Sequence, residues 1–73
     1  MKRVKVRLDK QSDVAEFVNI ASSIEEPVYL VDNTFNKVNG KSLMGCLYSL
    51  EFEELFVESE YESLSDKFRK FLM

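Results

Sequence analysis

The chain has 73 residues, of which 45% are hydrophobic, and its formal net charge is −3. This length and composition predict one small domain, residues 1–73, with a packed core. The acidic balance argues against nucleic-acid binding, because neutralising phosphates requires a basic face. With no histidine and one cysteine, Cys46, we expect no zinc site, no histidine-based catalysis and no internal disulfide. The expectation is a protein without metal, cofactor or enzymatic activity.

No apolar run approaches the ~20 residues that a membrane span needs, and the N-terminal residues lack the apolar core of a signal peptide. We therefore expect a cytoplasmic protein without a membrane partner. The charges are segregated: residues 1–10 carry five bases and one acid, whereas residues 51–62 carry six glutamates and no base. Two solvated strand faces would explain this distribution, and a basic site for an acidic partner is the alternative.

The first two elements follow from periodicity. Residues 2–8 alternate basic and apolar side chains, which predicts a strand with Val4, Val6 and Leu8 buried. A helix is predicted to begin near Ser12 or Asp13, both good N-caps, and to end at residues 25–27, because the residue before proline disfavours the helical conformation. Its apolar stripe is Val14, Phe17, Val18, Ala21 and Ile24.

The middle of the chain predicts a hairpin and a short helix. Val28 to Asp32 and Phe35 to Val38 are predicted strands around a tight turn at residues 33–34. Ser42 to Ser49 is a predicted helix, in which the Ser42 hydroxyl caps the first turn. We expect Leu47 and Leu50 to point inward and Leu43 and Met44 to be partly exposed.

The last two predicted elements are a strand over Glu53 to Glu58 and a helix from Ser59 or Glu60 to Leu72. The resulting order, β-α-β-β-α-β-α, predicts an α+β fold with helices on one face of an antiparallel sheet. The basic first strand and the acidic fourth strand are expected to be neighbours. Pairing them would set Arg3, Lys5 and Arg7 against Glu54 and Glu58, at a few tenths of a kcal/mol per pair.

Two short motifs resemble those of one family. Lys41-Ser42-Leu43-Met44-Gly45 resembles the Lys-Ser-Ile-Met-Gly signature of the HPr family, the small phosphocarriers of bacterial sugar phosphotransferase systems. Ala15-Glu16-Phe17-Val18 resembles the Ala-x-Phe-Val of that family's first helix. The resemblance implies an HPr-like open-faced β-sandwich, with a four-stranded antiparallel sheet of order 1-4-2-3 and three helices on one face.

The family's phosphate acceptor has no counterpart. In the family a histidine within Gly-Leu-His-x-Arg-Pro-Ala, just before the first helix, accepts the phosphoryl group. Aligned on Ala15 and Phe17, the histidine position falls on Lys10, the arginine on Ser12 and the proline on Asp13. A protonated lysine is a poor phosphoryl acceptor. We therefore expect no catalytic residue and no transfer of phosphate from enzyme I to sugar permeases.

Three hypotheses for function follow. The first is a regulatory or protein-binding module of the phosphoenolpyruvate-dependent sugar phosphotransferase system, without histidine phosphocarrier activity. The second is a phosphocarrier component phosphorylated at Ser42, which stands at the family's regulatory serine. The third is a small self-associating domain that uses an uncovered apolar patch on the open sheet face, formed by Tyr29, Val31 and Phe56.

The expected partners are proteins: components of the phosphotransferase system, an HPr kinase or a transcriptional regulator. The expected oligomeric state is a monomer or a weak dimer. The partner-binding residues that the resemblance implies are Lys41, Ser42, Leu43, Met44 and Leu47.

Overall fold

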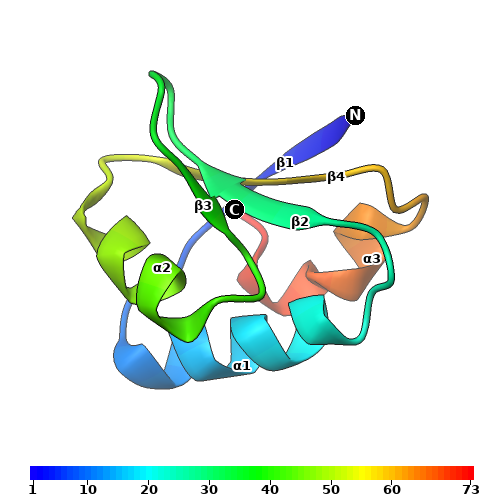
Figure 1. Cartoon of the computed structure of the whole chain (residues 1–73), viewed down its shortest axis with the longest axis horizontal. Coiled ribbons are helices and arrows are strands. Elements are labelled where there is room, and N and C mark those ends of the chain that lie inside the picture. The colour runs from blue at the N-terminus through cyan, green and yellow to red at the C-terminus, as the bar shows by residue number, and fades with distance from the viewer.

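The computed structural model describes residues 1–73, and its helices and strands follow the predicted order (Figure 1). The elements are β1 (Lys2–Val6), α1 (Gln11–Ser22), β2 (Val28–Val31), β3 (Lys37–Asn39), α2 (Leu43–Tyr48), β4 (Leu55–Ser59) and α3 (Leu64–Lys67), with 3-10 turns at Ser49–Glu51 and Arg69–Phe71.

The four strands form one antiparallel sheet in the order β1-β4-β2-β3. All three helices lie on one side of this sheet and leave its other side open (Figure 1). The predicted α+β architecture and strand order are therefore confirmed. No helix is long and apolar enough to cross a membrane.

Oppositely charged side chains cross the β1–β4 pair as the sequence predicts. Arg3 lies opposite Glu58, with 3.8 Å between the guanidinium and carboxylate, and the Lys5 ammonium lies 2.9 Å from the carboxylate of Glu54. The expectation for Arg7 is wrong, because β1 ends at Val6 and the Arg7 side chain instead pairs with Asp9 at 2.9 Å.

The core lies between the sheet and the helices, and Phe17 of α1 is at its centre. Its ring stacks on Phe68 with 4.7 Å between centroids and packs at a tilt on Phe71 at 6.1 Å. These contacts join α1 to the C-terminal segment. The fourteen buried residues of this core are Val6, Leu8, Val14, Phe17, Ala21, Ile24, Val28, Leu30, Cys46, Leu55, Val57, Leu64, Phe68 and Phe71.

The first helix begins earlier than predicted. Its N-cap is Lys10, which makes no side-chain capping bond. Asp13, one of the two predicted caps, lies inside the first turn, where its carboxylate accepts a hydrogen bond from the Asp9 backbone N–H at 3.0 Å. An acid in the first turn also suits the positive end of the helix dipole. The helix ends at Ser22, and Ile24 stays buried in the turn that follows.

The hairpin between β2 and β3 is wider than predicted. Residues 32–36 form a loop, and Phe35, predicted to lie in a strand, is 98% exposed. The cause is Asp32, whose carboxylate accepts hydrogen bonds from the backbone N–H groups of Thr34 (2.8 Å) and Asn36 (3.2 Å). These bonds fix a broad turn and delay β3 until Lys37.

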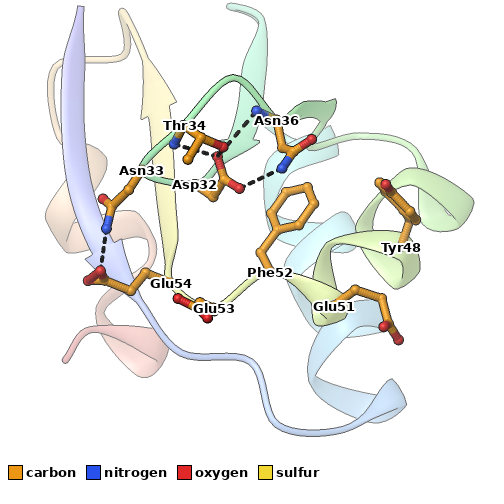
Figure 2. Close-up of a pocket in the computed structure, with 9 residues that line it drawn as sticks. All are labelled: Asp32, Asn33, Thr34, Asn36, Tyr48, Glu51, Phe52, Glu53 and Glu54. Atoms are coloured by element: carbon orange, nitrogen blue, oxygen red, sulfur yellow. Dashed lines mark hydrogen bonds between the residues drawn. The ribbon is translucent and has the colours of Figure 1, made fainter.

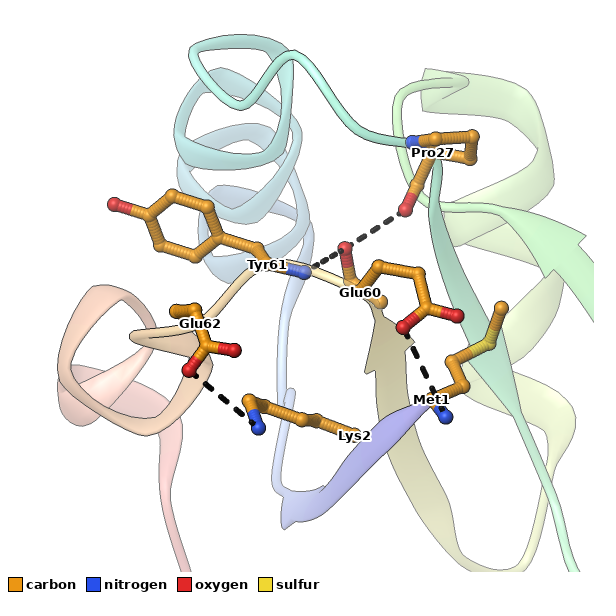
Figure 3. A network of polar contacts seen from close by, with 7 residues as sticks. Met1, Lys2, Pro27, Glu60, Tyr61 and Glu62 are labelled. Carbon is orange, nitrogen blue, oxygen red and sulfur yellow. Dashed lines mark hydrogen bonds and ion pairs between the residues drawn. The ribbon is translucent and has the colours of Figure 1, made fainter.

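The predicted long C-terminal helix is wrong. The backbone N–H of Tyr61 donates to the Ser59 hydroxyl at 3.2 Å, and that hydroxyl donates to the Pro27 carbonyl at 2.8 Å (Figure 3). This bonding holds the chain after β4 in a turn, so α3 begins only at Leu64. Beyond α3, Leu72 forms an antiparallel bridge with Val6 of β1. Pairing of Leu72 with the edge strand of the sheet competes with continuation of the helix.

The open sheet face carries the three predicted apolar residues, but they are not an uncovered patch. Val31 is only 6% exposed. The Lys37 ammonium lies 4.3 Å from the centre of the Tyr29 ring, and the Arg3 guanidinium lies at the same distance from the Phe56 ring. Both rings are half-buried, because cationic side chains lie over their faces.

Candidate functional site

A rigid turn positions the start of α2. The Ser42 hydroxyl accepts a hydrogen bond from the Gly45 backbone N–H at 3.2 Å, which confirms the predicted N-cap. The Ser42 N–H donates to the Asn39 carbonyl at 3.0 Å, and the Lys41 N–H donates to the Asn39 side-chain oxygen at 2.9 Å. The first turn of α2 is therefore anchored from both sides.

Gly40 allows this turn to approach β2 closely. Its N–H donates to the Val28 carbonyl at 2.6 Å. A Cβ atom at position 40 would lie 2.9 Å from Val28 Cγ1 and 3.0 Å from the Val28 carbonyl oxygen. Only glycine fits at this separation without a shift of the backbone, so the contact fixes where α2 begins relative to the sheet.

One side of α2 presents large apolar side chains to solvent. Leu43, Met44 and Tyr48 are 50%, 83% and 59% exposed, and we call these three residues the α2 face. Leu47 is half-buried and packs against the core. Tyr48 was missed from the sequence, although it stands four residues after Met44 and so on the same side of a helix.

Lys41 does not extend this surface with a free charge. Its ammonium donates to the carbonyl of Ile24 at 2.5 Å and to that of Glu25 at 3.4 Å, just beyond the end of α1. A cation at this position satisfies carbonyl groups near the C-terminal end of a helix. Lys41 therefore ties α1 to the turn before α2.

The start of α1, where the resemblance places the phosphate acceptor, carries charges of both signs. Lys10 is exposed at the N-cap. It shares a shallow pocket of about 320 Å³ with Arg7, Asp9, Asp13 and Lys70. The two carboxylates oppose a phosphate at this helix N-terminus and the three cations favour one, and the Asp9 N–H is already bonded to Asp13.

The single thiol, that of Cys46, is expected to be unreactive. Cys46 is fully buried inside α2 and lies 3.5 Å from the Gly40 carbonyl oxygen. Burial raises the pKa of its thiol to about 11. The nucleophilic thiolate is therefore scarce at neutral pH, and Cys46 serves the packing of α2.

A second feature borders the α2 face. A groove of about 370 Å³ runs between the β2–β3 loop and residues 48–54, and we call it the acidic groove (Figure 2). Tyr48 and Phe52 form its apolar side, edge to face with 5.6 Å between ring centroids. The nine residues that line it are Asp32, Asn33, Thr34, Asn36, Tyr48, Glu51, Phe52, Glu53 and Glu54. Four of them carry carboxylates, and none is a lysine or an arginine.

Two of the four carboxylates have lowered pKa values. Hydrogen bonds, first from the Asn36 side chain at 2.7 Å, lower the pKa of Asp32. Hydrogen bonds from Lys5 and Asn33 lower the pKa of Glu54. Both groups therefore stay ionised in mildly acidic solution. No group of three or more His, Cys, Asp or Glu side chains is arranged to hold a metal ion.

Comparison with known proteins gives a structural match. The chain matches no protein-family model and no curated protein. Among solved structures it is similar to the crystal structure of HPr-C-His from Thermoanaerobacter tengcongensis, with a TM-score of 0.68 and 23% sequence identity. The match covers 94% of this chain and 84% of that one. The fold of this chain is therefore HPr-like.

Proposed function

We propose that this chain is a regulatory or protein-binding module of the sugar phosphotransferase system that does not carry phosphate on histidine. The observation that supports this most is the α2 face, because three large apolar side chains exposed together on one helix are typical of a protein-docking surface. An HPr-like fold with this face, and with no histidine in its sequence, suits docking without phosphoryl transfer.

The local chemistry at the start of α1 agrees with this function. Lys10 is exposed, and a lysine ammonium has no lone pair with which to accept a phosphoryl group. The pocket around Lys10 carries charges of both signs, so the absence of histidine, and not repulsion, is what disfavours a phosphorylated intermediate. We expect that incubation with enzyme I and phosphoenolpyruvate leaves no acid-labile phosphate on the protein. Stoichiometric acid-labile phosphate would contradict the proposal.

Docking through α2 is tested by titration of the ¹⁵N-labelled protein with purified enzyme I and with an HPr kinase. Binding should perturb amide signals of α2, and Met44→Ala should weaken it. Met73→Ala is the matched control, because Met73 is similarly exposed, at 70%, outside α2. Equal weakening by both variants, or no binding to either protein, would refute docking through this face.

Phosphorylation at Ser42 is the alternative function. Its hydroxyl oxygen lies at the first turn of α2 and already accepts the Gly45 N–H, and a phosphate there would keep an acceptor oxygen at the helix start. Incubation with an HPr kinase and ATP should then label the wild type and leave Ser42→Ala unlabelled. An unlabelled wild type would exclude this alternative.

A further inference from the structure

The α2 face and the acidic groove are continuous, because Tyr48 belongs to both. Met44 stands one helical turn before Tyr48, so their exposed side chains follow one another along α2 toward the groove. The Tyr48 ring then meets the edge of Phe52 on the groove's apolar side. A partner seated on α2 would therefore extend directly between carboxylates.

Most of the negative charge of this combined surface is uncompensated within the chain. Lys5 neutralises Glu54, but Glu51 and Glu53 take part in none of the seven ion pairs of the structure. The Asp32 carboxylate is bonded only to neutral groups of its own loop, and the nearby Arg3 guanidinium donates to the Asp32 backbone carbonyl at 3.1 Å and not to the carboxylate. Three carboxylates beside an apolar strip therefore lack a cation.

We propose, on the basis of the function above, that the partner contributes a basic amphipathic segment. Its apolar side chains contact Met44, Tyr48 and Phe52, and its lysine or arginine side chains lie against Glu51 and Glu53. Complementary charge around an apolar centre is how protein interfaces select and orient a partner. Nucleic acid is repelled by the same carboxylates.

A second copy of this chain fits the surface poorly. Its basic side chains are largely engaged: the Arg3 and Lys37 cations lie over aromatic rings, and the Lys41 ammonium is bonded to backbone carbonyls. Most of the others are in ion pairs. The occupant that charge complementarity favours is therefore a different, cationic protein segment.

The probe for this proposal is a synthetic leucine–lysine peptide of about 14 residues with leucines at helical spacing, together with its leucine–glutamate analogue. Titration of the ¹⁵N-labelled protein with the lysine peptide should shift amide signals within residues 43–54. The interaction should weaken as salt screens the charges. No binding of the lysine peptide, or equal binding of the glutamate analogue, would overturn the proposal.

Charge variants locate the interaction. Glu51→Gln/Glu53→Gln should raise the dissociation constant of the lysine peptide at least about fivefold. Glu25→Gln/Glu62→Gln removes the same net charge from exposed positions outside the groove and should change it less than about twofold. Equal effects of the two variants would refute a role of the groove. So would displacement of the peptide by spermidine with an affinity equal to that of the peptide, because charge alone would then explain the binding.

The outcomes separate this inference from the proposed function. If enzyme I and the HPr kinase do not bind but the lysine peptide binds at residues 43–54, the proposed function fails and the basic partner chemistry stands. A second outcome is that enzyme I or the HPr kinase binds, that Met44→Ala weakens this binding, and that Glu51→Gln/Glu53→Gln leaves it unchanged. The proposed function then stands and the basic partner chemistry fails.

Discussion

Substitution by alanine should have opposite effects on stability at Gly40, which precedes α2, and at Gly45, which lies within it. At Gly40, the new methyl carbon would lie 2.9 Å from Val28 Cγ1 and 3.0 Å from the Val28 carbonyl oxygen. The oxygen cannot retreat without lengthening the 2.6 Å hydrogen bond that it accepts from the Gly40 N–H. Overpacking of this kind costs about 1–3 kcal/mol, so Gly40→Ala should lower the free energy of unfolding by an amount in this range.

At Gly45, the same substitution meets ordinary contacts, because the nearest atoms, Ser42 Oγ and Val38 Cβ, are 3.4 Å away. Alanine is favoured over glycine inside a helix by about 0.5–1 kcal/mol. Gly45→Ala should therefore raise the free energy of unfolding by up to about this amount.

Urea unfolding measures both effects, because the midpoint reports stability when the slope is unchanged. Far-ultraviolet circular dichroism is the signal to follow, since the chain has no tryptophan for fluorescence. A Gly40→Ala protein as stable as the wild type would refute the close-approach reasoning. So would a Gly45→Ala protein destabilised as much as Gly40→Ala.

Three further predictions concern side chains of the site. Ser42→Ala should lower the free energy of unfolding by about 1 kcal/mol through loss of the cap, whereas Ser42→Asp should keep it; equal urea midpoints for the two would contradict this. Cys46 should not react with a disulfide reagent until urea unfolds the protein. Burial raises the pKa of the folded thiol to about 11 from its ordinary value of 9.0. Between these two pH values unfolding releases a proton, so the free energy of unfolding should fall as pH rises from 9.0 to about 11, less steeply in Cys46→Ala. The lowered pKa values of Asp32 and Glu54 stabilise the fold above their ordinary values of 3.8 and 4.5, and this stabilisation should be lost as pH falls through the folded values. NMR titration of both carboxyl groups checks the direction.

The sequence predicted the pairing of β1 with β4 well because the signals there were mutually consistent. Alternation in β1 and the opposed charges of Arg3 and Glu58 gave both the buried side and the neighbouring strand. The short helix was predictable from Ser42 and its apolar spacing for the same reason.

The errors occurred where side-chain hydrogen bonds decide the backbone. The apolar periodicity from Tyr61 to Leu72 fits one long helix. However, Ser59 holds Tyr61 in a turn, and Leu72 forms a bridge with the edge strand β1. Asp32 similarly widens a hairpin that strand propensity alone would close tightly. The bonds of Ser59 and Asp32 join near neighbours, whereas the Val6–Leu72 bridge joins distant residues. Hydrophobic periodicity reveals neither kind of competition.

The candidate site was only half predictable. Leu43 and Met44 were expected to be partly exposed, and they are. The acidic groove was not foreseen, because it brings residues of the β2–β3 loop against residues 48–54, and the glutamates of that stretch read as a solvated strand face.

The segment after α3 has a bearing on aggregation. The Arg7 N–H donates to the Phe71 carbonyl at 2.8 Å, and the Met73 N–H donates to the Lys5 carbonyl at 3.3 Å. These bonds occupy the Lys5 carbonyl near the end of β1 and the Arg7 N–H just beyond it, so a foreign strand cannot pair along the whole of this edge. The opposite border of the sheet is β3, which is only three residues long. A fibril grows by adding strands at two borders, and here one border is partly occupied and the other is short.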